Sequence, residues 1–212
     1  SAGEGIDNYF KELGVEKIVS GGQTMNPSIE DIIAVVKSCN AKVVYVLPNN
    51  SNIIMAAVQA ADVLSEEIDV RVIPTKTIPQ GIVAASTFNP DASVDENEEA
   101  MKSSYENLKS GSITYAIKDT TVDGFKVIKD YFMGIFDKKI VVCEKNKITA
   151  LKKLLKQMIS EETYLVTLFV GEDIDENTVS ELQSELPEAY PNVEFDIQLG
   201  KQPVYSFLLG VE

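Results

Sequence analysis

Histidine and tryptophan are both absent from the 212 residues. Histidine is the commonest general base and the commonest metal ligand, so serine and cysteine nucleophiles lack their usual activator here. The two cysteines, Cys39 and Cys143, lie far apart and outside any CxxC pattern, which favours free thiols in the reducing cytosol. Neither an apolar run of about 18 residues nor a signal peptide is visible. We therefore expect a cytoplasmic protein that is not an enzyme by itself, with no catalytic residues, no metal and no cofactor.

Arginine is nearly absent as well, since Arg71 is the only one, and 33 acidic residues oppose 19 basic ones for a net charge of −14. Arginine is the preferred partner of phosphates and base edges. Binding to nucleic acid or to anionic membranes is therefore not expected. A net charge of this size ordinarily serves solubility. The alternative is an acidic face that meets a basic partner, and composition leaves both open.

The first part of the chain alternates between strand and helix patterns. Apolar runs at 17–20, 43–47 and 70–74 predict strands, and helical spacing of apolar residues predicts helices over 28–36, over 53–64 and from about residue 80. Strands separated by helices imply crossover connections and a parallel sheet that is covered on both faces. Residues 1–90 are therefore expected to form a parallel-sheet lobe with helices on both faces.

The pattern changes after this lobe. Residues 89–97 are polar and acidic and predict a linker, and residues 98–109 predict a helix ended by Gly111. Later strand patterns, with turns at 122–125 and 137–138 and further helices, predict an α+β lobe. The expected fold class is α/β: a parallel lobe at 1–90, a linker and helix at 91–111, and a smaller α+β lobe at 112–212. The acids between 91 and 99 favour a solvated linker over metal ligands.

Three polar loops, at 21–28, 48–52 and 74–81, each follow a predicted strand and lead into a helix. In a parallel sheet they would share the edge where open α/β sheets bind ligands, and helix N-termini there suit an anion or a partner. The alternative is that such residues only cap helices and form turns. Neither GxGxxG nor a P-loop is present, so nucleotide binding is not expected. The candidate binding residues are Thr24, Asn26, Ser28, Asn49, Asn50, Ser51, Asn52, Thr75, Lys76 and Thr77.

The same loops carry a resemblance to a known family. The segments GGQTMNPS at 21–28, LPNNSNIIMA at 47–56 and IPTKTIPQG at 73–81 closely resemble the carboxy-terminal region of the ATP-binding subunit of bacterial fatty acid kinases, often labelled dihydroxyacetone-kinase-like. The segments TYAIKDT at 114–120, Asp123-Gly124, GKQPVY at 200–205 and Val211-Glu212 agree. The resemblance spans nearly the whole chain, and the order of its three long motifs makes it specific.

This resemblance implies a full-length protein with a kinase domain that binds ATP and magnesium, followed by a middle domain. The present chain, which begins with Ser1, would be a non-catalytic C-terminal domain of a two-component kinase. Its implied partners are that kinase domain and a separate fatty-acid-carrying protein of the DegV type, which it would dock.

A weaker resemblance is to DegV-type proteins themselves, in the order of the predicted elements. Asn26-Pro27-Ser28 stands where that family has a Ser/Thr-Gln-Pro-Ser loop, and Asn49 to Asn52 stand where it has a Ser-Gly-Leu-Ser-Gly loop that offers a hydroxyl to the lipid carboxylate. Only Ser51 keeps a hydroxyl here. The alternative function that follows is a module that binds a small anion or a fatty acid between the two lobes.

Overall fold

The structure is a computed structural model that describes residues 3–19, residue 21 and residues 26–212. It divides into two compact units: unit 1 contains Asp7–Asn107, and unit 2 contains Gly3–Ile6 and Leu108–Glu212. Helix α1 (Glu4–Glu12) begins in unit 2 and ends in unit 1. Residues 91–107, which the sequence assigns to a linker and helix, belong to unit 1.

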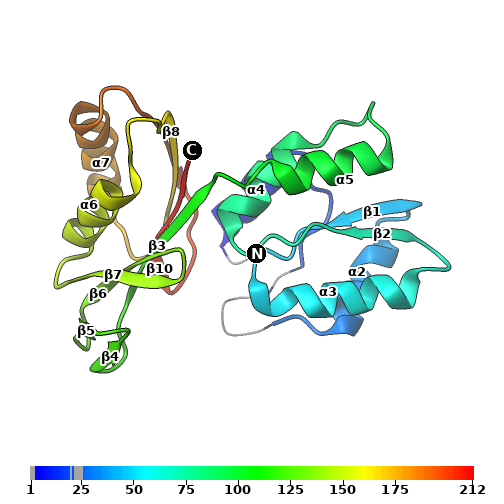
Figure 1. Ribbon diagram of the computed structural model, residues 1–212, viewed down its shortest axis with the longest axis horizontal. Coiled ribbons are helices and arrows are strands. Elements are labelled where there is room, and N and C mark those ends of the chain that lie inside the picture. Colours follow the sequence, from blue (N-terminus) through cyan, green and yellow to red (C-terminus); the bar gives the residue numbers. More distant parts are fainter. Residues whose placement is uncertain (1–2, 20, 22–25) are drawn as a thin grey trace. The chain divides into compact units, whose positions relative to one another are not determined.

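Unit 1 is a small parallel sheet with helices on both faces (Figure 1). Strands β1 and β2 pair in parallel, with Val43 opposite Asp69, and α3 forms the crossover between them. Val44 and Val46 pack against α2 and α3, whereas Tyr45 and Leu47 pack against the residues of α4 and α5, because successive strand side chains point to opposite faces. After α1, the elements of unit 1 are α2 (Ile29–Ser38), β1 (Val43–Val46), α3 (Ser51–Leu64), β2 (Asp69–Val72), α4 (Ile78–Thr87) and α5 (Val94–Ser103).

The strand predicted at 17–20 is wrong for the described residues, because 15–19 have no regular secondary structure. Ile18 and Val19 instead line a cavity beside β1. Only these two apolar residues stand between Glu16-Lys17 and the glycines at 21 and 22, so little burial offsets the entropy of ordering a strand. Ser20 lies outside the described residues.

The helix predicted at 98–109 is also wrong in its bounds, since α5 runs from Val94 to Ser103. Ser93 caps it with a capping box: the Ser93 hydroxyl accepts from the Glu96 N–H, and the Glu96 carboxylate accepts from the Ser93 N–H. The box begins the helix within the stretch that was predicted to be a linker. Gly111 lies inside the first long strand of unit 2 and ends no helix.

Unit 2 is built around a six-stranded mixed sheet in the order β7-β6-β3-β10-β8-β9. All neighbouring pairs are antiparallel except β8 and β9, which are parallel and joined by α7. The predicted turn at 137–138 is confirmed, with both residues at positive φ. The elements are β3 (Lys109–Tyr115), β4 (Thr120–Val122), β5 (Phe125–Val127), β6 (Phe132–Phe136), β7 (Lys139–Glu144), α6 (Lys147–Met158), β8 (Leu165–Val170), α7 (Glu176–Ala189), β9 (Glu194–Leu199) and β10 (Tyr205–Val211).

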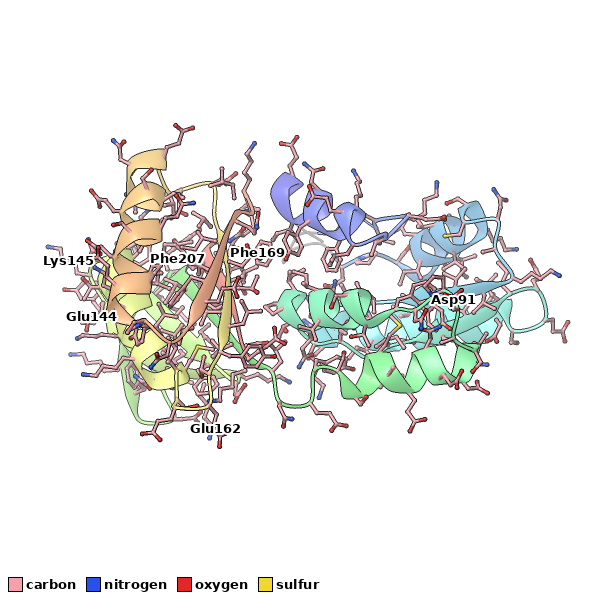
Figure 2. All side chains as sticks on the ribbon, turned by 90° about the horizontal axis from the view of Figure 1, so that it is seen from above. Asp91, Glu144, Lys145, Glu162, Phe169 and Phe207 are labelled. Atoms are coloured by element: carbon pink, nitrogen blue, oxygen red, sulfur yellow. The ribbon has the colours of Figure 1, made fainter. Side chains whose placement is uncertain are left out.

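The core of unit 2 lies between one face of this sheet and the helices α6 and α7. Leu151, Leu154 and Leu155 of α6 have no exposed surface, and they pack in one cluster with Leu182 of α7 and Phe207 of β10. Figure 2 shows Phe207 on the side of β10 that faces the helices. Burying an aliphatic side chain of this size contributes about 1.5–3 kcal/mol, so this cluster is a major source of stability for the unit.

Residues Gly3–Ile6 are held against the β9–β10 connection of unit 2. The N–H groups of Gly5 and Ile6 donate to the carbonyl oxygen of Gly200 at 3.1 and 3.3 Å. A Cβ atom on Gly5 would lie 1.7 Å from the carbonyl oxygen of Leu199, so only glycine permits this approach. Two N–H groups in the first turn of α1 thus find their hydrogen-bond acceptor in a segment almost 200 residues further along the chain.

Among the described residues, no helix combines the length and the apolar character needed to cross a bilayer.

Candidate functional site: a polar loop edge beside an apolar cavity

Two of the three predicted loops meet through Asn49 and Thr75. The Asn49 N–H donates to the Thr75 hydroxyl at 3.0 Å, and that hydroxyl donates to the Asn49 side-chain oxygen at 2.8 Å. Thr75 is fully buried and Asn49 has a positive φ of 58°, which asparagine tolerates. Gly81 makes room for the asparagine, since a Cβ atom there would lie 1.9 Å from its side-chain oxygen. The ends of both strands therefore lie at one edge of the sheet.

Three candidate residues act as helix caps. The side chains of Ser28, Asn50 and Thr77 accept hydrogen bonds from the first turns of α2, α3 and α4 respectively. The Ser28 backbone N–H and hydroxyl donate to Asp31, which lowers the pKa of that carboxyl. The capping alternative thus accounts for the local role of these three residues.

The remaining candidates are exposed or outside the described residues. Asn26, Ser51 and Asn52 are exposed. Lys76 is exposed too; its backbone N–H donates to Gln80, and its ammonium group forms no ion pair with a described residue. Thr24 lies outside the described part of the chain. That these residues bind an anion or a partner stays a prediction.

A cavity of about 410 Å³ lies within unit 1, between α1, α2 and β1. Its described walls are mainly aliphatic, and Asn49 of the loop edge is one of the few polar side chains among them. Gly21 and Pro27, from the first predicted loop, also line it. Most of the described lining residues are Phe10, Leu13, Val15, Ile18, Val19, Ile32, Val35, Val36, Cys39, Val43, Val44, Tyr45, Val46, Leu47, Ile53, Ala85, Phe88 and Met101.

Sequence reasoning missed this cavity. The structure reveals it at the strand 43–46, where every residue is only half-buried although the run is almost wholly apolar. Burial raises the pKa of the Cys39 thiol, and the nearby Glu16 adds to the rise while Lys17 opposes it. The Tyr45 hydroxyl donates to the Val94 carbonyl oxygen at 3.1 Å, and burial raises its pKa. The tyrosine hydroxyl is therefore already used in joining β1 to α5.

The single arginine is a structural residue. Arg71 of β2 contacts Asp69 at 2.6 Å through Nε, and its Nη1 contacts Glu98 at 2.6 Å and Asp95 at 3.0 Å. Lys102 also pairs with Glu98. Glu98 thus ties α5 to β2 through Arg71, and the Asp95 side chain joins this contact while remaining 86% exposed.

Acidic residues gather toward the C-terminal end of the chain. Residues 158–212 contain twelve acids and one lysine, whereas residues 109–157 contain eleven lysines and five acids. Helix α7 has four glutamates and no basic residue. Glu185 pairs with Lys152 of α6, but Glu176, Glu181 and Glu188 are exposed and form no ion pair within the described chain. Unit 2 therefore carries an acidic surface along α7.

No group of three or more cysteine, aspartate or glutamate residues within the described ranges is arranged to hold a metal ion.

Known proteins resemble this sequence over its entire length. The model of the FakA-like C-terminal family, which describes the C-terminal domain of a fatty acid kinase component, matches residues 1–212. The chain belongs to this family. Protein YloV of Bacillus subtilis is 47% identical over 210 residues, and an uncharacterized protein of Staphylococcus aureus is 43% identical over 212. The chain spans only 38% of the length of each of these curated relatives.

The fold is similar to solved structures of DegV-type proteins. A DegV family protein from Corynebacterium glutamicum superposes with a TM-score of 0.65 at 15% identity, covering 97% of this chain and 91% of that one. The Streptococcus pneumoniae fatty acid kinase B3 protein, solved loaded with linoleic acid, gives 0.62 at 14% identity, covering 98% and 83%. At such identity the likeness establishes a DegV-like fold.

Proposed function

We propose that this domain docks a fatty-acid-carrying protein of the DegV type and thereby serves a kinase whose catalytic part lies elsewhere in the full-length protein. Its family membership supports this assignment, and so does its 38% share of the length of its relatives. The observation that carries the proposal is the chemistry of the surface. Ser28, Asn50 and Thr77 of the loop edge serve as helix caps, whereas α7 presents glutamates without a partner among the described residues.

The contact we favour is between the acidic surface of α7 and a basic patch on the carrier. Complementary charge speeds the encounter and sets orientation, so reversing the charges on one side slows association and changes its salt dependence. A stable docking interface needs at least about 1,000 Å² of buried surface. Glu176, Glu181 and Glu188 span nearly the whole of the 14-residue helix and can supply the charged part of such an area.

The test is to titrate the purified chain with the carrier protein by calorimetry at two salt concentrations. We expect saturable binding that weakens at higher salt, with no consumption of ATP by the chain alone. Replacing Glu176, Glu181 and Glu188 together by lysine should weaken binding by tenfold or more at low salt.

A matched control replaces three exposed glutamates of unit 1, Glu12, Glu66 and Glu106, by lysine. These substitutions change the net charge by the same amount. This variant should retain affinity within about threefold. Equal losses in both triple variants would show that only net charge matters. Absence of association at high micromolar concentration would refute the docking role.

The second candidate is a module that binds a small anion or a fatty acid between the lobes. The DegV-like fold favours it, because several of the similar structures are described as fatty-acid-binding proteins. Against it, the loop at 49–52 offers asparagine at three of its four positions. Native mass spectrometry of the purified chain would reveal a co-purified fatty acid if this candidate is correct.

A further inference from the structure

We propose that the cavity of unit 1 binds a small uncharged aliphatic molecule that carries a hydrogen-bond acceptor, such as a medium-chain alcohol or ester, with the Asn49 side chain as donor. Every described lining residue lies between Phe10 and Met101, so the described walls of the cavity all belong to unit 1. Its volume of about 410 Å³ falls in the range of small-molecule sites, about 300–1,000 Å³. The inference is independent of the docking role proposed for α7.

The walls select an aliphatic body. The cavity is lined by aliphatic side chains from three elements: Val35 of α2, Val44 and Val46 of β1, and Ile53 of α3. The only side chain with a polar group between the two valines of β1 is Tyr45. The tyrosine hydroxyl is already bonded to the Val94 carbonyl oxygen. An aliphatic chain that fills this space removes apolar surface from water at about 25 cal/mol per Å².

One polar group is held in place beside these walls. Thr75 fixes Asn49 by two hydrogen bonds, one at its backbone N–H and one at its side-chain oxygen, and Gly81 leaves space for the amide. The amide nitrogen of Asn49 has no hydrogen-bond partner among the described residues, and Asn49 lines the cavity. A fixed amide donor beside an apolar wall is suited to a carbonyl or hydroxyl oxygen.

The electrostatics favour an uncharged head group. Glu16 and Lys17 are the only charged residues among the described lining residues, and they offset each other. Two N–H groups in the first turn of α3 next to Asn49 are taken, since the Asn52 N–H donates to the Asn50 side chain and the Ile53 N–H to the Asn50 carbonyl oxygen. Lys17 is the only cation that an ionised carboxylate would find among the described lining residues, Glu16 offsets its charge, and the chain as a whole is strongly acidic.

Cys39 provides a reporter, because it lines the cavity and Cys143 belongs to unit 2. In a Cys143→Ser background, the rate of Cys39 modification by a thiol reagent is measured with increasing 1-octanol or octanoate. These probes share a chain length and differ in the head group. We expect octanol to slow modification saturably, and octanoate to require at least tenfold higher concentration.

Two variants sharpen the test. Asn49→Asp keeps the oxygen that accepts from Thr75 but replaces the amide donor, so it should weaken octanol protection about five- to tenfold. Asn52→Asp makes the same chemical change on the exposed first turn of α3 and should leave protection unchanged. Ala85→Leu, which fills part of the cavity, should lower affinity for both probes.

Circular dichroism of each variant confirms that it remains folded. Equal or stronger protection by octanoate would overturn the proposal, as would protection that is unchanged in Asn49→Asp. Lack of protection by octanol up to its solubility limit would overturn it too.

Discussion

The strands of the two units are buried to different degrees. In unit 2, strand β10 is buried at every residue except Tyr205, and α6 and α7 close over one face of the sheet with leucine side chains. In unit 1, all four residues of β1 are half-buried, and a cavity lies beside them. The difference shows that unit 2 has the closed packing of a scaffold, whereas unit 1 leaves interior space that a ligand can fill.

The largest change in stability is expected from a matched pair of leucine truncations, which tests this comparison. Leu154→Ala in the closed core of unit 2 should lower the free energy of unfolding by about 3–5 kcal/mol, because a new cavity forms around a fully buried side chain. Leu47→Ala in unit 1 should cost about 1–2 kcal/mol, since Leu47 is half-buried and already borders empty space.

Urea unfolding followed by circular dichroism and by tyrosine fluorescence gives both values, and it shows whether the units unfold together. Met55→Ala on the exposed side of α3 is the control and should change stability by less than about 0.5 kcal/mol. Equal costs for the two leucines would remove the distinction between the units.

An intermediate effect is expected from two glycines. Gly81→Ala would place a Cβ atom 1.9 Å from the Asn49 side-chain oxygen, so the asparagine must move and buried Thr75 loses a partner. We expect a loss of about 1–3 kcal/mol in unfolding free energy. Gly111→Ala in unit 2 meets the flexible end of Met158 at 2.6 Å, and the smaller cost of shifting that end should make it the milder variant. A Gly111→Ala variant less stable than Gly81→Ala would contradict this account.

The smallest effect concerns pH. Lys102, and after it Arg71, lowers the pKa of Glu98, and Arg71 lowers the pKa of Asp69. A carboxyl whose folded pKa is depressed stabilises the fold above its unfolded pKa, and this contribution is lost as the pH falls through the folded value. The urea midpoint of unit 1 should therefore decline below about pH 4.

The variant Arg71→Met removes the shared partner of these acids, so its midpoint should depend less on pH between about 4 and 2 than that of the original chain. Lys201→Met, which removes a lysine from a long, exposed pair with Glu4, is the control and should retain the full dependence. Identical pH profiles for Arg71→Met and the original chain would exclude the arginine as the cause.

Regular, strongly patterned segments were predictable from the sequence. Helices α2 and α3 and strands β1 and β2 follow runs whose periodicity or apolar content is unambiguous. The misplacement of α5 had a different origin, since the Ser93–Glu96 capping box that starts it sits inside a stretch whose acidity suggested a solvated linker. Local capping overrode composition there.

The site was only partly predictable. That the loops after β1 and β2 share an edge follows from parallel pairing, and the Asn49–Thr75 contact agrees with it. The cavity could not be foreseen, because it depends on residues 15–19 remaining outside a regular strand. Periodicity describes faces of elements and does not report the volume left between them.

The contact between Gly3–Ile6 and the Leu199–Gln202 segment has a consequence for biosynthesis. A ribosome adds about 5–20 residues per second, so these early residues wait roughly 10–40 s before the chain that receives them has been made. During that interval the first turn of α1 lacks its acceptor at Gly200, and unit 2 reaches its final form only when translation of this region is nearly over.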